Sequence, residues 1–159
     1  MPRILAVDWG ERRIGLAVSD ALGILATGLP TLEIRGEAEA VAKVADTIRN
    51  VEADSVVVGL PLTLAGGKGE AARAAERFAE ALRGATGLEV SLFDERLTST
   101  LAARRMRERG EKSRGAKGRV DQGAAMALLE GWLARLRYER QDESGGRAPE
   151  EGSGGEGSE

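Results

Sequence analysis

Five short runs of branched apolar residues constrain the fold of this chain more than any other sequence feature. The first three, in RILAVDWG, RRIGLAVSD and the segment Ile24–Ile34, follow one another with short connections. Such runs predict β-strands, and the short connections predict an antiparallel meander. The other two, DSVVVGLP and LEVSLFD, each follow a segment with the spacing of an amphipathic helix. The chain is therefore predicted to contain five strands.

The helical segments complete the predicted element order. Apolar residues recur every three or four positions over Glu37–Glu52 and over the alanine-rich Glu70–Thr86. Two further helices are predicted over Thr98–Arg109 and Val120–Tyr138, with the loop EKSRGAKG between them. Strands that alternate with helices after a meander favour an α/β fold, in which a mixed sheet is covered on both faces.

The length and the charge distribution predict one domain followed by a tail. A chain of 159 residues is typical of a single domain. The last stretch, QDESGGRAPEEGSGGEGSE, has six acidic residues, one basic residue and six glycines, and no aliphatic core residue. We therefore expect residues 1–140 to form the domain and residues 141–159 to form a disordered tail. Without this tail, 22 basic and 20 acidic residues give a net charge of +2.

Two missing residue types restrict the chemistry. The chain has no cysteine and no histidine. Disulfides, thiolate nucleophiles, cysteine-ligated zinc and a Ser-His-Asp triad are therefore excluded. Polar chemistry has to come from carboxylates, lysine, arginine, tyrosine or hydroxyl groups. A site built from carboxylates suits hard cations such as Mg²⁺ or Mn²⁺.

The sequence also argues against membrane insertion and against the common nucleotide loops. No apolar run is long enough to cross a bilayer, and Arg3, Asp8 and Glu11 interrupt the N-terminal apolar stretch. We expect a cytoplasmic protein with no membrane partner. The GGKGEAA segment lacks the spacing of a P-loop, and no GxGxxG follows a strand.

Asp8 is the first candidate for a catalytic residue. It lies at the carboxyl end of the first predicted strand, on the same face as Ile4 and Ala6. Strand ends are where α/β sheets build their sites, and Gly10 and Gly15 permit close approach of a ligand or of another backbone segment. The alternative is an aspartate that only begins the turn at WGER.

Two later carboxylates are the other candidates. Glu95 stands between the last predicted strand and a basic helix, where Asp94 competes for the same role and where an acid also stabilises a helix N-terminus. Asp121 continues the apolar stripe of the last predicted helix, so its ionised form is costly unless it is paired, capped or bound to a cation. The alternative for Asp121 is a helix cap.

A basic segment between Arg104 and Arg119 is the candidate for phosphate binding. It has eight basic residues against Glu108 and Glu111, a local excess of +6 in sixteen residues. Such an excess is typical of a surface that binds nucleic acid, although a solvated helix face has the same composition. The basic residues are Arg104, Arg105, Arg107, Arg109, Lys112, Arg114, Lys117 and Arg119.

Four motifs resemble one known family in order and spacing. They are DWGERRIGLAVSD, VVVGLPLTLAGGKGEAA, FDERLTSTLAARRM and GRVDQGAAMALLEGWL. They are similar to the motifs of the YqgF family, bacterial RNase H-like proteins described as pre-16S rRNA nucleases or as RuvX-type Holliday junction resolvase homologues. The resemblance covers Arg3 to Tyr138. It implies an RNase H-like fold, with a five-stranded mixed sheet in the order 3-2-1-4-5 and helices on both faces.

The resemblance also implies an activity, the metal-dependent hydrolysis of phosphodiester bonds in structured RNA, with 5′-end maturation of pre-16S rRNA as the expected role. The implied catalytic and metal-binding residues are Asp8, Glu95 and Asp121, with Mg²⁺ or Mn²⁺ as the cofactor. The implied nucleic-acid-binding residues are Arg12, Arg13, Arg96, Arg104, Arg105, Lys112, Arg114, Lys117 and Arg119. The fourth acid of the related RuvC-type resolvases has no counterpart here, because Gly118 and Ala124 stand at the positions three residues from Asp121.

Three alternatives stay open at this point. A Holliday junction resolvase acts on branched DNA and needs a symmetric dimer, whereas no clear apolar helix face is left over here, so we expect a monomer or a weak homodimer. A non-catalytic nucleic-acid-binding factor in ribosome maturation would use the three carboxylates for structure only. An actin-like phosphotransferase has a similar DxGxxxxG loop, here Asp8, Gly10 and Gly15, but needs two such domains.

Overall fold

The computed structural model describes residues 3–62, 67–95 and 122–141. Within these ranges, five strands form one sheet in the order β3-β2-β1-β4-β5. The strands are β1 (Ile4–Asp8), β2 (Arg13–Ser19), β3 (Ala26–Glu33), β4 (Ser55–Leu60) and β5 (Glu89–Asp94). The pairs β1–β2 and β2–β3 are antiparallel, and the pairs β1–β4 and β4–β5 are parallel. The predicted meander, mixed sheet and strand order are confirmed.

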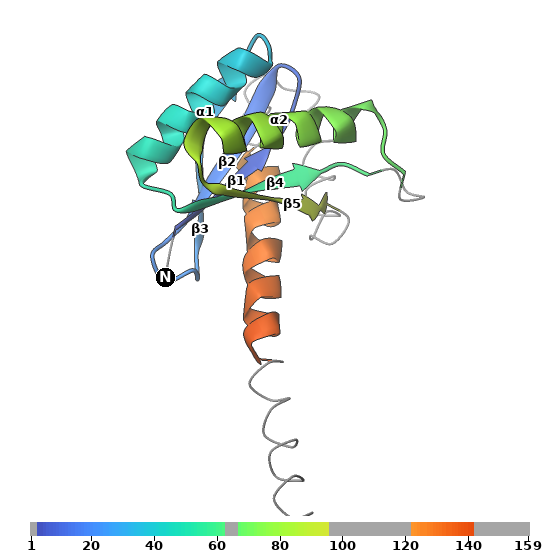
Figure 1. Ribbon diagram of the computed structural model, residues 1–159. Helices are drawn as coiled ribbons and strands as arrows, with labels where there is room; N and C mark the ends of the chain where they lie inside the picture. The colour runs from blue at the N-terminus through green and yellow to red at the C-terminus, as the bar shows by residue number, and fades with distance from the viewer. Residues whose placement is uncertain (1–2, 63–66, 96–121, 142–159) are drawn as a thin grey trace, which may run out of the picture.

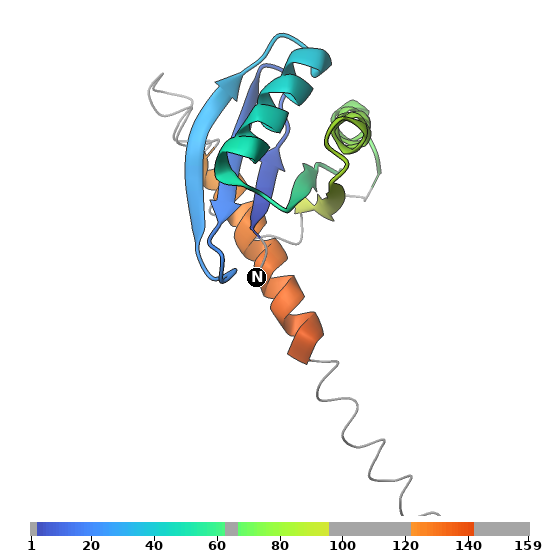
Figure 2. The ribbon, with the colours of Figure 1, turned by 60° about the vertical axis from the view of Figure 1, so that its left-hand side comes forward.

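Helices cover both faces of this sheet. The helices α1 (Glu37–Val51) and α2 (Glu70–Thr86) pack side by side on one face, and a helix over residues 122–141 crosses the other (Figures 1 and 2). We call the latter the 122–141 helix. It includes Gln141, the first residue of the predicted tail. The rest of that tail, the predicted helix Thr98–Arg109 and the loop after it lie outside the described residues.

Each face of the sheet has its own apolar core. Odd-numbered residues of β1, such as Leu5 and Val7, pack with α1 and α2. Even-numbered residues, Ile4 and Ala6, pack with the 122–141 helix. This separation follows from the alternation of side chains along a strand. Asp8 therefore belongs to the face that the 122–141 helix covers, as counting by two predicted.

The helices α1 and α2 are amphipathic, with buried apolar residues directed at the sheet and charged residues on the outer side. Within the described ranges, no helix combines the length and the apolar character that a bilayer crossing requires.

Candidate carboxylate site

The end of β1 is held in place by the two residues that follow Asp8. The Trp9 ring stacks on Phe78 of α2, with ring centroids 4.7 Å apart and an interplanar angle of 27°. Gly10 allows the turn into β2, because a Cβ there would lie 2.4 Å from the Arg13 carbonyl oxygen. Since Trp9 is anchored on the α2 face, the preceding side chain, Asp8, is directed to the opposite face.

Glycines stand on both sides of Asp8. In the antiparallel pair of β1 and β2, Asp8 lies opposite Gly15. In the parallel pair of β1 and β4, Val7 lies beside Val58, so the next step along both strands brings Gly59 beside Asp8. Asp8 therefore lies between Gly15 of β2 and Gly59 of β4, so neither adjacent strand has a side chain beside Asp8.

Glu95 fills the space above one of these glycines. A Cβ added to Gly59 would lie 2.9 Å from Glu95 Oε1 and 3.2 Å from Glu95 Cγ. It would also lie 3.4 Å from a methyl group of Leu128 in the 122–141 helix. The half-buried Glu95 carboxylate therefore lies across β4, under this helix, at the strand position next to Asp8.

The structure also distinguishes Glu95 from its neighbour Asp94. Asp94 pairs with Leu60 at the ends of β5 and β4 and lines a groove on the outer side of β5. Glu95, one residue later, shares the Asp8 face of the sheet. Because of the register of β4 and β5, two of the three predicted carboxylates occupy neighbouring positions, and Asp94 is not one of them.

The third predicted carboxylate, Asp121, lies outside the described residues. Gln122, which follows it in the sequence, begins the described part of the 122–141 helix. Its Nε2 donates a hydrogen bond to the Leu29 carbonyl oxygen at 2.8 Å, and its side chain packs on Gly28 of β3. Most of the predicted phosphate-binding residues also lie outside the described ranges, namely Arg96, Arg104, Arg105, Lys112, Arg114, Lys117 and Arg119.

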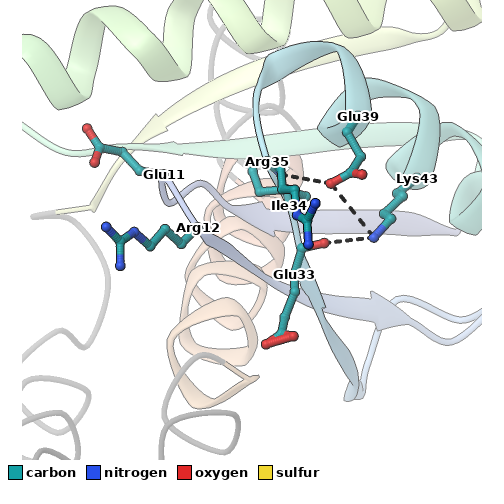
Figure 3. Close-up of a pocket in the computed structure, with 7 residues that line it drawn as sticks. All are labelled: Glu11, Arg12, Glu33, Ile34, Arg35, Glu39 and Lys43. Carbon is teal, nitrogen blue, oxygen red and sulfur yellow. Dashed lines mark hydrogen bonds and ion pairs between the residues drawn. The ribbon is translucent and has the colours of Figure 1, made fainter.

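Arg12 and Arg13 come from the turn and strand that follow Asp8. Arg13 is half-buried at the start of β2, whereas Arg12 is exposed and lines a hollow of about 650 Å³ (Figure 3). The Ile34 backbone N–H donates to the Arg12 carbonyl oxygen at 2.9 Å, which brings Arg35 into the same hollow. Within the described part of the chain, the guanidinium groups of Arg12 and Arg35 have no ion-pair partner.

Lys43 and Glu39 form an ion pair in this hollow, which the Glu11 and Glu33 carboxylates also line. Lys43 Nζ donates to the Glu33 carbonyl oxygen at 2.8 Å and lies 3.9 Å from Glu39 Oε1. The Arg35 backbone N–H donates to the same Glu39 carboxylate at 2.7 Å (Figure 3). Arg35 could not be found from the sequence, because it reaches Arg12 through the pairing of β2 with β3 and no motif marks it. The two arginine side chains are the cations of this hollow that are available to an anion.

Comparison with known proteins assigns the chain to a family. The family model described as RuvX, Holliday junction resolvase, matches residues 2–135, which include all three candidate carboxylates. The chain belongs to the RuvX family. A relative from Anaeromyxobacter dehalogenans strain 2CP-C, named "Putative pre-16S rRNA nuclease", is 47% identical over 133 residues, which cover 84% of this chain and 97% of the relative. A Rhodococcus jostii protein of the same name is 44% identical over 152 residues, covering 92% and 85%.

Solved structures show the same fold for this RuvX-family chain. RuvC of Thermus thermophilus in complex with a Holliday junction substrate superimposes with a TM-score of 0.55 at 16% identity, covering 86% of this chain and 96% of RuvC. A second structure of Thermus thermophilus RuvC gives a TM-score of 0.51 at 15% identity, covering 84% and 96%. The RNase H-like fold implied by the sequence motifs is confirmed.

The donor chemistry of the RuvX-family site fits a hard divalent cation. Asp8 and Glu95 supply carboxylate oxygens over a floor that Gly59 leaves free of a side chain, and such oxygens are the ligands of Mg²⁺ and Mn²⁺. The described residues contain no cluster of three or more acidic side chains able to hold a metal. They contribute a pair of carboxylates, to which a third ligand has to be added.

Proposed function

We propose that this RuvX-family chain is a divalent-metal-dependent nuclease that hydrolyses phosphodiester bonds in structured RNA. Pre-16S rRNA is the substrate, and maturation of its 5′ end is the role. The observation that carries this proposal is the Glu95 carboxylate lying over Gly59, at the strand position beside Asp8. The relatives' name supports the RNA substrate.

In this proposal each group has one task. Asp8, Glu95 and Asp121 hold the cation, Mg²⁺ or Mn²⁺. When bound, divalent cations activate water and neutralise charge that develops on the phosphate oxygens. Trp9, through its stack on Phe78, keeps the Asp8 side chain directed at the substrate face.

The arginines bind the phosphates that flank the cleaved bond. Arg12 and Arg35 offer planar guanidinium groups, whose donors match two phosphate oxygens at once. Arg96 directly follows Glu95 in the sequence, and Arg13 begins the strand β2 that pairs with the strand of Asp8. The basic segment Arg104–Arg119 binds phosphates of the RNA backbone farther from the cleaved bond. The chain acts in the cytoplasm, as a monomer or a weak homodimer.

A cleavage assay tests the proposal. Fragments of precursor 16S rRNA and four-way DNA junctions are incubated side by side with the full chain, with Mn²⁺, Mg²⁺ or a chelator. We expect cleavage of the RNA only with a cation present. Asp8→Asn and Glu95→Gln should each lower the cleavage rate at least about 100-fold, because each removes a cation ligand and with it several kcal/mol of transition-state stabilisation.

Two matched variants serve as controls. Asp46→Asn and Glu80→Gln remove exposed carboxylates on α1 and α2, which pair with Arg49 and Arg83 far from the site. Both should keep full activity.

Cleavage of the junction without cleavage of the RNA would favour the resolvase. Binding of both substrates, with no cleavage of either, would identify a non-catalytic binding factor.

A further inference from the structure

A groove of about 590 Å³ runs between the outer edge of β5 and the 122–141 helix. Its walls include Phe93 and Ser91 from β5 and Trp132 and Arg135 from the helix. Figures 1 and 2 show β5 as the last strand of the sheet, beside this helix. The volume lies within the range of small-molecule sites.

Two aromatic rings and a guanidinium group line part of the groove, beside three leucines and the acidic Asp94 and Glu139. The Trp132 and Phe93 rings meet edge to face, with centroids 5.3 Å apart at 71°. The guanidinium carbon of Arg135 lies 5.9 Å from the centroid of the Phe93 ring, and Arg135 Nε donates to Glu139 at 3.3 Å. Phe93 is buried, whereas Trp132 is half-buried and faces the groove. Aromatic rings and guanidinium planes are the groups on which proteins stack unpaired bases.

The groove opens beside the carboxylate pair. Leu60 and Asp94, which pair in the register of β4 and β5, line its inner end. Gly59 precedes Leu60 and Glu95 follows Asp94, so on each strand the residue that lines the groove is the sequence neighbour of one at the carboxylate site. A chain of nucleotides bound at Asp8 and Glu95 can therefore place a neighbouring base in the groove.

We propose that this groove receives an unpaired nucleobase of the substrate, next to the cleaved phosphate; the proposal rests on the nuclease function above. The base lies against Trp132 and Arg135, and the Ser91 hydroxyl and Asp94 carboxylate accept hydrogen bonds from its N–H groups. A base held in a duplex cannot enter, so the groove makes the enzyme select single-stranded or bulged segments. Phosphate contacts alone give no such selection.

Tryptophan fluorescence tests this directly, because the chain has two tryptophans. In Trp9→Phe, which keeps an aromatic ring on Phe78, Trp132 becomes the reporter. The variant is titrated with a single-stranded RNA of about twelve nucleotides, a typical single-strand site size, and with an abasic strand of equal length and charge. A DNA strand of the same sequence is the third arm. We expect strands that carry bases to quench the Trp132 fluorescence and the abasic strand not to quench it. The ratio of the DNA affinity to the RNA affinity identifies which nucleic acid supplies the preferred base.

Affinities give a second readout. Stacking of one base should make the base-carrying RNA bind roughly tenfold more tightly than the abasic strand. Trp132→Leu should abolish this difference. Tyr138→Leu, which removes an exposed aromatic ring of the same helix outside the groove, should preserve it.

Three results would overturn the proposal. Equal quenching by the abasic strand, or an unchanged base preference in Trp132→Leu, would remove the groove from substrate binding while the carboxylate-dependent cleavage still stood. Binding of neither strand would also overturn the proposal, whereas the nuclease function itself is tested separately by the cleavage of precursor 16S rRNA fragments.

Discussion

Gly59 is the residue on which the geometry of the carboxylate pair depends. Glycine is unfavourable inside a strand, because it loses more backbone freedom on folding than other residues and contributes no side-chain packing. Its place in β4 is accounted for by Glu95, whose Oε1 would lie 2.9 Å from any Cβ added there. The Glu95 carboxylate occupies the space that a side chain at position 59 would fill.

Gly59→Ala should therefore reduce activity without unfolding the chain. The added methyl group displaces the Glu95 side chain, and we expect cleavage to fall at least about tenfold, because a displacement on the scale of 1 Å is costly for catalysis. The free energy of unfolding should change by less than about 1 kcal/mol, because the gain in strand propensity opposes the contact. Cleavage rates and urea unfolding measure the two effects.

Gly84→Ala is the matched control, since a Cβ at this position of α2 meets nothing within 4 Å. It should raise stability by about 0.5–1 kcal/mol and leave the cleavage rate unchanged. Full activity in Gly59→Ala would show that the position of Glu95 over β4 does not matter for cleavage.

Asp20 is the residue that makes the turn between β2 and β3 sensitive to acid. Its Oδ1 accepts hydrogen bonds from the backbone N–H groups of Ile24 at 2.8 Å and Leu25 at 3.3 Å. The bond from Ile24, above all, lowers the pKa of the Asp20 carboxyl below the ordinary value of 3.8. A lowered folded-state pKa stabilises the fold above the unfolded-state pKa, and this contribution is lost as the pH falls through the folded-state value.

The Ile24 amide resonance should therefore shift with a midpoint below pH 3.8 when the chain is titrated with acid. Asp20→Asn should abolish this transition and leave the amides of α1 unaffected. A midpoint at or above 3.8 would contradict the role of the turn hydrogen bonds.

At the scale of elements, the 122–141 helix packs on the face of the sheet where Glu95 lies above Gly59. Leu129 is fully buried against the sheet, and its neighbour Leu128 reaches the space above Gly59. Leu129→Ala should lower the free energy of unfolding by about 2–5 kcal/mol, because it leaves a cavity in the second core. Urea unfolding measures the loss. Tyr138→Ala, at a position that is 70% exposed, should stay within about 0.5 kcal/mol of the parent chain.

The elements were predictable from the sequence because their apolar periods are long and regular. Counting by two placed Asp8 on the face of Ile4 and Ala6, and these two residues belong to the core under the 122–141 helix. The partner of Asp8 was not predictable in the same way. The family resemblance named Glu95, but the residue pattern alone left Asp94 as a competitor, because the choice between them depends on the register of β4 and β5. The role of Gly59 depends on the Glu95 side chain that lies above it. Both are tertiary facts, which local patterns do not contain.

At the scale of the whole molecule, charge is distributed unevenly along the chain. Residues 142–159 carry six acidic residues and one basic residue, so their deletion changes the net charge from −3 to +2. We expect the truncated chain to bind RNA more tightly at low salt, and the difference to shrink as added salt screens the charges. Its melting temperature should equal that of the full chain. A lower melting temperature would show that these residues contribute to the stability of the domain.

The strand order has a consequence for the time at which the carboxylate pair is made. In the sheet β1 is central and β5 lies at the edge. In the sequence, Glu95 is synthesised 87 residues after Asp8. At about 5–20 residues per second, this interval lasts roughly 4–17 s. A nascent chain therefore carries Asp8 beside a bare Gly59 until β5 has left the exit tunnel and paired with β4. Under the proposed function, a nascent chain that has emerged only as far as β4 therefore lacks the Asp8 and Glu95 pair that cleavage of RNA requires.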